Sequence, residues 1–349
     1  MKEILPFTFP GLIEQEILDI GTRQISYMRT KEFSDLVLES QYLLNRFLDN
    51  DEGKVIIYTA SGTAAMESAV CNYVSQFERK LVINGGTFGK RWKEICDYYQ
   101  FACDVFHVEF GKDIDYNKLE NEIKKNKYEV LLCQHHETSS GQLFNMDIIS
   151  EICRKHTVSL VVDAISSFLA DPFSMKKWNI DVAVLSSQKG LNLPPGLSML
   201  FLSAKALRTG FTGRNFYLDI TENLSNLKRG QTPYSPATTL FMQLHSRLRK
   251  LEKDGVEITL KKVKDNAVYF RKICKEMTWK LSAEIPSSCI TGFYVDGGRK
   301  ISELLVNEGI YVMPSGDEQL LRISHIGLQG KAEIDLLVNE IINLEKNHK

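Results

Sequence analysis

Short apolar runs that alternate with amphipathic stretches constrain the fold of this chain more than any other feature. Between about residues 55 and 203, runs such as KVIIYTA, KLVING, YEVLLCQ and SLVVDA are separated by stretches such as GTAAMESAVCNYVSQF, FGKRWKEICDYY and NMDIISEICRKH. Strands that alternate with helices form parallel sheets, because each helix carries the chain back to the start of the next strand. The pattern predicts an α/β fold with helices on both faces of a mostly parallel sheet. The last two runs, DVAVLSSQ and LSMLFLS, could form an antiparallel hairpin.

The pattern changes after residue 204. Two long amphipathic stretches, TTLFMQLHSRLRKLEK and VKDNAVYFRKICKEM, precede two strand candidates, ITGFYV and LLRISHIG, and a further amphipathic stretch, KAEIDLLVNEIINLEK. We therefore expect an N-terminal arm over residues 1–30, a large α/β domain over residues 31–235 and a smaller α+β domain over residues 236–349.

Charge and cysteine content argue against several classes of protein. The 349 residues include 43 lysines and arginines against 44 aspartates and glutamates, so the chain lacks the basic excess typical of nucleic-acid binding. No stretch approaches the roughly 18 uninterrupted apolar residues of a membrane span, and the N-terminal sequence lacks the apolar core of a signal peptide. Seven scattered cysteines without a C-x-x-C pair argue against a disulfide framework and a structural zinc site. We expect a cytoplasmic protein without a nucleic-acid, membrane or metal partner.

One lysine, Lys189, stands directly after the apolar run DVAVLSSQ and before the Gly/Pro-rich segment GLNLPPG. A lysine is ordinarily a solvated surface residue, but here the chain is leaving what reads as a buried strand. Parallel sheets bind ligands outside the carboxyl ends of their strands. Lys189 is therefore a candidate for a chemical role.

Two other strand ends carry candidate ligand-binding residues. Ser61, Gly62 and Thr63 follow VIIYTA and open the next helix, where free N–H groups suit a phosphate, although Ser61 also suits an ordinary helix cap. Asp163 lies at the end of the apolar run SLVVDA, where capping a turn is its ordinary role. Neither a P-loop nor a G-x-G-x-x-G fingerprint is present at these positions.

One cofactor would use these three features together, namely pyridoxal 5'-phosphate (PLP). Its aldehyde needs an amine, and its phosphate needs a cup of small, hydrogen-bonding residues. Its pyridine nitrogen needs a carboxylate that keeps the ring protonated. The combination predicts PLP as the cofactor.

The order of the motifs SGTAAME, NGGTFGKRW, HHETSSG, VVDAISS and SSQKGL resembles that of the class V aminotransferases of fold type I. The similarity continues to LRISHIG near the C-terminus, which resembles the arginine-bearing strand of that family. Within the family, the chain is most similar to the alanine–glyoxylate, serine–pyruvate and 2-aminoethylphosphonate–pyruvate enzymes. The resemblance implies a mostly parallel, seven-stranded sheet between helices and a smaller C-terminal α+β domain.

The resemblance also implies roles for single residues. Lys189 would bind PLP covalently, and Asp163 would pair with the pyridine nitrogen. Phe88 would stack on the ring, Thr138 would approach the ring hydroxyl, and Arg322 would bind the substrate carboxylate. The phosphate would be held by residues of two subunits of a homodimer with shared active sites: Ser61, Gly62, Thr63 and Gln188 from one subunit, and Thr232 and Ser235 from its neighbour.

The implied reaction moves an amino group from a small donor to a small 2-oxo acid by ping-pong kinetics. The donor would be alanine, serine or 2-aminoethylphosphonate, and the acceptor pyruvate or glyoxylate. Lys189 would remove the proton from the donor's Cα in its neutral form, which burial favours. A PLP-dependent lyase or desulfurase remains an alternative, because it would share every cofactor residue. A silent binding protein and a nicotinamide oxidoreductase fit less well, because the anchor residues are present and the glycine fingerprint is absent.

Several residues depart from the family pattern or allow two interpretations. The segment FTFPGL stands where many relatives carry a Gly-Pro turn that shapes the substrate pocket, which leaves the substrate open. Gln188 replaces the histidine that precedes the lysine in desulfurases. Arg29 is either a solvated charge or a second group that binds a phosphonate or distal carboxylate. His135 and His136 are expected as buried histidines rather than metal ligands, because adjacent side chains of an extended chain point to opposite sides.

Overall fold

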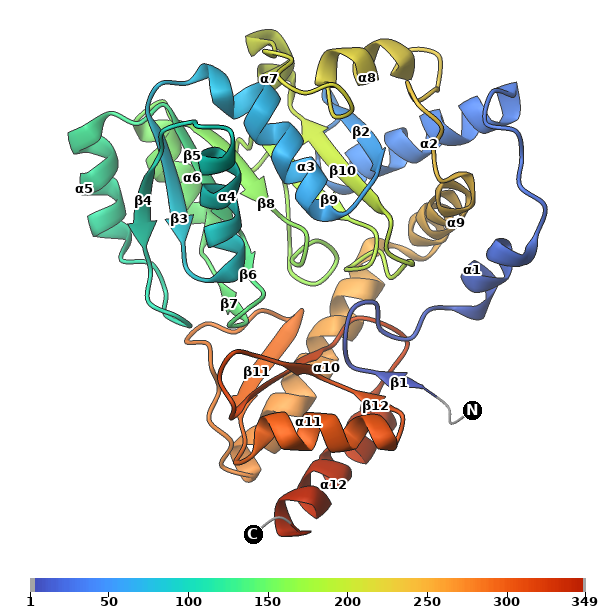
Figure 1. Ribbon diagram of the computed structural model, residues 1–349, viewed down its shortest axis with the longest axis vertical. Helices are drawn as coiled ribbons and strands as arrows, with labels where there is room; N and C mark the ends of the chain where they lie inside the picture. The colour runs from blue at the N-terminus through green and yellow to red at the C-terminus, as the bar shows by residue number, and fades with distance from the viewer. Residues whose placement is uncertain (1–3, 348–349) are drawn as a thin grey trace.

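The computed structural model describes residues 4–347 and contains a central sheet of seven strands (Figure 1). The order across the sheet is β2-β10-β9-β8-β5-β3-β4. β10 runs antiparallel to β2 and β9, and the other neighbouring strands are parallel. The predicted α/β class and the hairpin of the last two runs are confirmed. The strands are Lys54–Thr59 (β2), Lys80–Asn84 (β3), Asp104–His107 (β4), Val130–Gln134 (β5), Ser159–Asp163 (β8), Val182–Ser186 (β9) and Leu197–Leu202 (β10).

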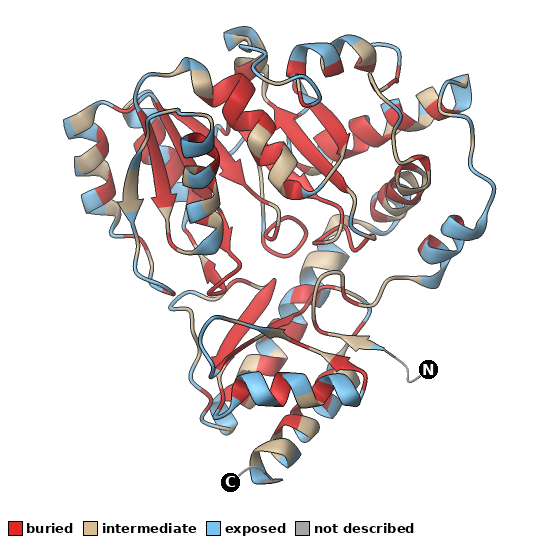
Figure 2. Ribbon diagram, viewed as in Figure 1, coloured by how far each residue is buried: buried red, intermediate tan, exposed pale blue. Residues whose placement is uncertain are grey.

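Side chains on the two faces of this sheet pack into two separate apolar clusters. Along β2, Val55 and Ile57 belong to one cluster, and Ile56 and Tyr58 belong to the other. This alternation follows from the two-residue period of a strand, and Figure 2 shows the sheet buried between its helices. One face is covered by Lys31–Phe47 (α2), Tyr116–Asn126 (α5), Met146–Lys155 (α6) and Thr238–Asp254 (α9), and the other by Gly62–Ser68 (α3) and Thr87–Tyr98 (α4).

The helix after β2 is shorter than the amphipathic run GTAAMESAVCNYVSQF predicts. α3 ends at Ser68, and the chain continues as a π-helical turn over Ala69–Tyr73 and a 3-10 turn over Val74–Gln76. The Asn72 side chain donates to the Leu218 carbonyl at 3.1 Å, and the Thr212 hydroxyl donates to the Cys71 carbonyl at 2.9 Å. These bonds join the irregular turns to a segment far along the chain, so no local sequence pattern predicts them.

A smaller antiparallel sheet, β11-β14-β13, lies below the large sheet in Figure 1. The predicted strands ITGFYV and LLRISHIG form Ile290–Tyr294 (β11) and Leu320–Ser324 (β14), and β13 is Met313–Pro314. Val256–Glu276 (α10), Gly298–Asn307 (α11) and Lys331–Asn347 (α12) pack on this sheet. At the other end of the chain, Leu5–Pro6 (β1) pairs in parallel with Ile310–Tyr311 (β12). The remaining elements are Gln15–Asp19 (α1), Ile20–Thr22 (a 3-10 turn), His136–Glu137 (β6), Gln142–Leu143 (β7), Ala204–Thr209 (α7) and Ile220–Leu227 (α8).

The carboxyl ends of β2, β3, β5, β8 and β9 meet at one edge of the large sheet, because these strands run in the same direction. The small sheet lies against this edge. Ser282 donates to the Ser140 carbonyl at 2.6 Å, and Arg322 donates to the Thr138 carbonyl at 2.9 Å. The predicted site residues at the strand ends therefore face the arginine of β14.

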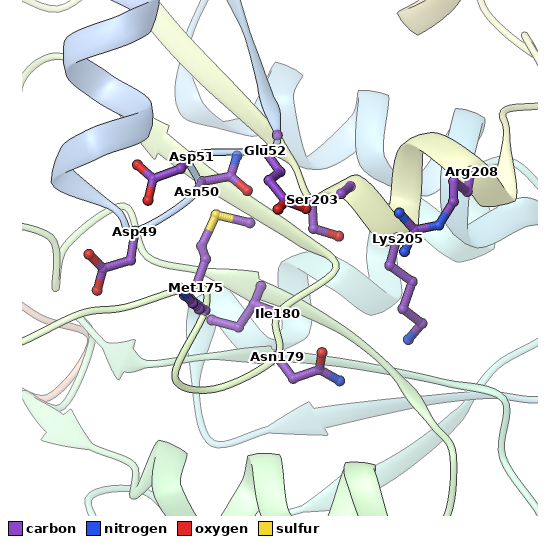
Figure 3. A pocket seen from close by; sticks show the side chains of 13 residues that line it. Asp49, Asn50, Asp51, Glu52, Met175, Asn179, Ile180, Ser203, Lys205 and Arg208 are labelled. Atoms are coloured by element: carbon purple, nitrogen blue, oxygen red, sulfur yellow. The ribbon is translucent and has the colours of Figure 1, made fainter.

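A depression lies at the edge of the large sheet that is opposite the carboxyl ends of these strands (Figure 3). It measures about 340 Å³ and is bordered by acidic residues of the α2–β2 loop, including Asp51 and Glu52, and by Lys205 and Arg208 of α7. None of the predicted site residues lines it. In the part of the chain that the structure describes, no helix has the length and apolar character needed to cross a membrane.

Candidate active site

Lys189 lies in the loop between β9 and β10, and its side chain is buried. Among residues 4–347, no side chain or carbonyl forms a hydrogen bond or ion pair with its Nζ atom. The nearest partner is the ring of Phe9, whose centroid lies 3.5 Å from Nζ. Burial disfavours the charged amine and lowers the pKa of Lys189 to about 8. The structure thus presents a buried amine that is easily deprotonated.

Asp163 ends β8 and is also buried. Its Oδ1 atom accepts a hydrogen bond from the Ile165 amide at 2.8 Å. Burial raises the pKa of this carboxyl to about 7, an effect that the Ile165 amide reduces and the nearby Glu137 carboxyl increases. The Lys189 amine also acts on this carboxyl group and favours its charged form, but it forms no hydrogen bond or ion pair with it among the described residues. A buried carboxyl group of this kind can pair with a protonated ring nitrogen.

The turn from β2 into α3 carries the predicted phosphate-binding residues. Ser61 precedes the first residue of α3, and its hydroxyl makes no capping bond, so it is free to bind a ligand. Gly62 packs so closely that an added Cβ would lie 2.6 Å from Cδ1 of Ile165. Thr63 accepts a hydrogen bond from Nη1 of Arg91 at 3.1 Å. Arg91 adds a cation beside this turn that we did not predict from the sequence.

Two polar atoms near Lys189 are buried without a hydrogen-bond partner in the described structure. They are Oε1 of Gln188 and Oγ of Ser186. Buried polar atoms are rarely left unpaired in folded proteins, so such atoms beside a buried amine indicate a missing polar ligand. Gln188 was predicted from the sequence, and Ser186, the last residue of β9, was not.

Thr138 belongs to a chain of hydrogen bonds that the sequence did not reveal. Its hydroxyl donates to Oγ of Ser166 at 2.8 Å, and Nδ1 of His136 lies 2.8 Å from the same Ser166 oxygen. Nε2 of His136 and Nδ1 of His135 have no partner among the described residues, so these buried histidines are only partly satisfied. Burial lowers the pKa of His136 well below its ordinary value and keeps the ring neutral.

Glu137 holds the start of α4, where Phe88 lies. Its carboxyl group accepts hydrogen bonds from the amides of Phe88 and Gly89 at 3.2 and 3.0 Å. The same group also accepts from Ser139 and Gln134. Because the N-cap position of α4 is Gly86, which has no side chain, this distant carboxyl replaces the usual cap.

Phe88 and Arg322 line one cavity of about 420 Å³ at the junction of the large and small sheets. Two guanidinium nitrogens of Arg322 donate to the carbonyls of Thr138 and Pro314, at 2.9 and 3.0 Å. Its Nε atom is buried without a partner, and burial lowers its pKa. The arginine is therefore fixed in place, and its buried Nε–H group has no partner among the described residues. Besides Phe88 and Arg322, the cavity is lined by Thr87, Phe110, Ser139, Tyr294, Ser315, Gly316, Asp317 and Leu320.

Three predicted residues lie together but apart from the buried amine. Arg29 is exposed and donates to Oε1 of Gln231 at 2.8 Å and to the Thr232 carbonyl at 2.9 Å. The Thr232 hydroxyl donates to the Tyr234 carbonyl, and Ser235 is exposed. The bonds that Arg29 makes within the chain therefore join it to the segment expected at a dimer interface.

The buried amine, the buried carboxyl group and the unpaired polar atoms fit PLP in chemistry as well as in order along the chain. Lys189 provides an amine, Asp163 a partner for a ring nitrogen, and Ser61 and Gln188 free groups for a phosphate. The fold and this set of side chains define a PLP-dependent enzyme of fold type I.

Comparison with known proteins identifies the family. The model of the family "Aminotransferase class-V" matches residues 21–267, so the chain belongs to the class V aminotransferases and its cofactor is PLP. The resemblance inferred from the motifs is confirmed. Among curated relatives, a serine–glyoxylate aminotransferase of Hyphomicrobium methylovorum is 29% identical over 293 residues, covering 81% of this chain and 70% of the relative.

Two further similarities cover nearly the whole chain. The small subunit of a soluble hydrogenase of Synechococcus is 28% identical over 335 residues, covering 92% of this chain and 87% of that protein. The crystal structure of an alanine–glyoxylate aminotransferase of Nostoc superposes with a TM-score of 0.92 at 22% identity, covering 99% of this chain and 96% of that one. At this identity, the superposition establishes the fold.

Proposed function

We propose that this class V aminotransferase moves an amino group from a small donor to a small 2-oxo acid by ping-pong kinetics. The donor is alanine, serine or 2-aminoethylphosphonate, and the acceptor is pyruvate or glyoxylate. The observation that carries the proposal is the position of Arg322, a guanidinium group whose Nε–H lacks a partner in the described structure, across the carboxyl edge of the sheet from a buried amine. The name of the Hyphomicrobium relative, a serine–glyoxylate aminotransferase, supports the same substrate class.

Lys189 and Asp163 perform the central steps in this proposal. When bound, PLP supplies an electron sink for the electron pair left when the donor's Cα–H bond breaks. Lys189 Nζ would hold the cofactor through its aldehyde, and the amine, once free, would take the Cα proton of the donor as a general base. A pKa near 8 allows this amine to accept and return a proton near neutral pH. Asp163 would keep the ring nitrogen protonated.

The other predicted residues orient cofactor and substrate. Ser61, Gly62, Thr63 and Gln188 would hold the phosphate, and Phe88 would pack on the ring. Thr138 would bond the ring hydroxyl through its own hydroxyl oxygen, which Ser166 already orients. Arg322 binds the carboxylate common to both 2-oxo acids, because a guanidinium group pairs with a carboxylate through two parallel hydrogen bonds.

We further propose a cytoplasmic homodimer in which Thr232 and Ser235 of one subunit complete the phosphate site of the other. The exposed Ser235 and the contact between Arg29 and the Thr232 carbonyl support this part of the proposal. In that arrangement, Arg29 would enter the neighbouring site as the group that binds a phosphonate or a distal carboxylate.

Single-turnover experiments test the donor and the two arginines. Each ¹⁵N-labelled donor is mixed with the PLP-loaded enzyme, pyruvate or glyoxylate is added, and the oxo product and the labelled amino acid are quantified. Arg322→Ala should lower the rate with every donor by roughly ten- to a hundredfold, because a charge-assisted hydrogen bond is lost. Arg29→Ala should slow chiefly 2-aminoethylphosphonate. Arg249→Ala, which removes a surface arginine paired with Glu39, is the matched control.

Equal loss across all donors in Arg29→Ala would reject its proposed role. A lyase or desulfurase would release ammonia, alanine or sulfide without forming a labelled amino acid from the acceptor. One observation already weighs against desulfurase chemistry. Cys289, the cysteine that acts on Lys189, is fully buried, and burial raises its pKa far above the range in which a thiolate forms.

A further inference from the structure

The segment from Phe7 to Leu12, which we call the N-terminal strap, is fixed at both ends. At its start, the Phe7 amide donates to the Tyr311 carbonyl at 2.8 Å, and the Phe7 carbonyl accepts from the Ser324 amide at 2.8 Å. This extends the pairing of β1 with β12, which Figure 1 shows at the side of the small sheet. At its end, the Leu12 carbonyl accepts from Nδ2 of Asn192 at 2.9 Å. Because Asn192 lies three residues after Lys189, the strap is tied directly to the lysine loop.

Close packing leaves the strap little freedom. An added Cβ at Gly11 would lie only 2.0 Å from the Ile326 carbonyl oxygen, so only glycine allows this approach. Phe9, two residues earlier, packs against the apolar cluster that contains Cys289, Ile290 and Ile326. The ring of Phe9 is therefore supported from behind by the small sheet and its neighbours.

The front of the ring faces Lys189. Its centroid lies 3.5 Å from Nζ, well inside the roughly 6 Å within which a cation is attracted to an aromatic face. The charged or titratable groups that act on Lys189 are Asp163 at the end of β8, Cys289 before β11 and Arg322 on β14. The charge of Lys189 also acts on His136 of β6 and lowers the pKa of that ring. None of these groups is hydrogen-bonded or ion-paired with Nζ among the described residues, whereas the ring of Phe9 lies in contact with it.

We propose that Phe9 is a positioning residue for the transamination lysine: its ring face holds Nζ of Lys189 at the carboxyl edge of the sheet and stabilises its ammonium form. The proposal rests on the proposed function for its catalytic meaning, because the proton held by Nζ is the one exchanged with the donor. A ring in this place partly offsets the lowering of the Lys189 pKa by burial. Without the ring, Lys189 would lose protons at lower pH and would move more freely.

The pKa of Lys189 in the full-length, cofactor-free protein tests the proposal. Cyanate, a small reagent that modifies an amine only in its neutral form, is reacted with the protein over a range of pH. The Lys189 peptide is quantified by mass spectrometry, and each rate is divided by the concentration of isocyanic acid, the reactive form, at that pH. The midpoint of rate against pH gives the pKa, and it does not depend on how easily the reagent enters. In Phe9→Leu, which keeps the bulk and removes the ring, the midpoint should fall by roughly half a unit to one and a half units.

The direction of this shift follows from the charge of the ammonium form, which is the form that the ring stabilises. Loss of its aromatic partner makes the ammonium less stable, so the amine is neutral at lower pH and reacts about three- to thirtyfold faster well below the wild-type midpoint. Phe9→Tyr, which restores a ring, should return the midpoint to the wild-type value. Phe173→Leu, a change of the same kind at a partly buried ring that packs against the rings of His135 and Trp178, should leave it unchanged.

An unchanged midpoint in Phe9→Leu, or an equal change in Phe173→Leu, would overturn the proposal. If Phe9→Leu does not fold, as judged by its circular dichroism, Phe9→Met replaces it, because methionine fills a similar volume without a ring face. The pH dependence of absorbance in the PLP-loaded enzyme provides a second readout, and it should shift in the same direction. The labelling is independent of donor turnover, so failure of the proposed substrates would leave this test intact.

Discussion

Asp163 and Lys189 show how burial sets the chemistry of individual side chains at this site. Removal from water disfavours the charged form of each group, so the pKa of Asp163 rises to about 7 and that of Lys189 falls to about 8. Both groups therefore titrate near neutral pH when no cofactor is bound. A basic ring nitrogen and an aldehyde would give each of them a partner, which is why we assign both to PLP.

The raised pKa of Asp163 predicts how the stability of the cofactor-free protein depends on pH. Between about pH 4, where an unfolded aspartate titrates, and about pH 7, the folded chain binds more protons than the unfolded chain. The free energy of unfolding therefore falls as the pH rises through this window. Asp163→Asn should remove this dependence and stabilise the cofactor-free protein at pH 8 by on the order of a few kcal/mol. It should also lose most turnover, because an amide cannot keep the ring nitrogen protonated.

Urea unfolding of cofactor-free protein at pH 5 and pH 8, together with steady-state rates of the loaded enzyme, measures both effects. Asp171→Asn is the contrasting variant, because Asp171 already accepts hydrogen bonds from Ser287 and Ser288 and its replacement should only destabilise. Near-wild-type turnover in Asp163→Asn, or a loss of stability at pH 8 like that of Asp171→Asn, would contradict the assignment.

Lys189, Asp163 and Ser61 could be predicted because each follows an apolar strand, and the ends of parallel strands share one edge. Ser166 and Phe9 could not be predicted in the same way. Ser166 is one of several serines whose neighbours do not distinguish it, and the link between Phe9 and Lys189 spans about half of the chain. Such contacts depend on how helices, strands and loops pack together, and they produce no periodic pattern in the sequence.

Helix α4 depends on a carboxyl group that lies outside it. The amides of Phe88 and Gly89 are buried against Glu137 and have no other partner in the described structure, so Glu137→Ala leaves them unsatisfied. We expect a loss of unfolding free energy of about 1–3 kcal/mol or more and weaker binding of PLP, because Phe88 lies in the affected turn. Glu137→Gln keeps one acceptor oxygen and should fall between the wild type and the alanine variant.

Urea unfolding and PLP titration of both variants check this expectation. Glu151→Ala, a change at an exposed position of α6, controls for the loss of a surface carboxyl group. Wild-type stability in Glu137→Ala would show that water or another group replaces the carboxyl oxygens.

Most elements could be predicted from their periodicity, and the exceptions share a cause. The strands of the large sheet follow short apolar runs, and the long helices α9, α10 and α12 follow apolar residues at helical spacing. The regular helix expected after β2 stops at Ser68, where the chain instead bonds to the segment around Leu218. The role of Glu137 could not be predicted for a similar reason, because the amides that it binds, those of Phe88 and Gly89, lie far from it in the sequence.

At the scale of the whole molecule, the proposed homodimer predicts that two chains are needed for one site. Thr232 and Ser235 form no hydrogen bond with Lys189 among the described residues. They lie near exposed aromatic residues such as Phe216, whose ring is 5.6 Å from that of Tyr234. If the sites are shared, Lys189→Ala and a Thr232→Val/Ser235→Ala variant should each be impaired. After the two are mixed and reassociated, roughly a quarter of the sites should be intact, because random pairing gives heterodimers with one complete site.

Activity of the mixture measures this complementation, and sedimentation measures the mass of the assembly. Activity equal to the mean of the separate variants, or a monomer in sedimentation, would contradict the shared site.

Reduction of the loaded enzyme with borohydride tests the central assignment most directly. We predict a yellow protein whose visible absorption band disappears on reduction while one cofactor per chain remains covalently attached. Peptide mapping by mass spectrometry should locate the adduct at Lys189, within the segment SSQKGL. An adduct on a different lysine, or none at all in an enzyme that still transfers amino groups, would contradict the assignment of Lys189 and of the site built around it.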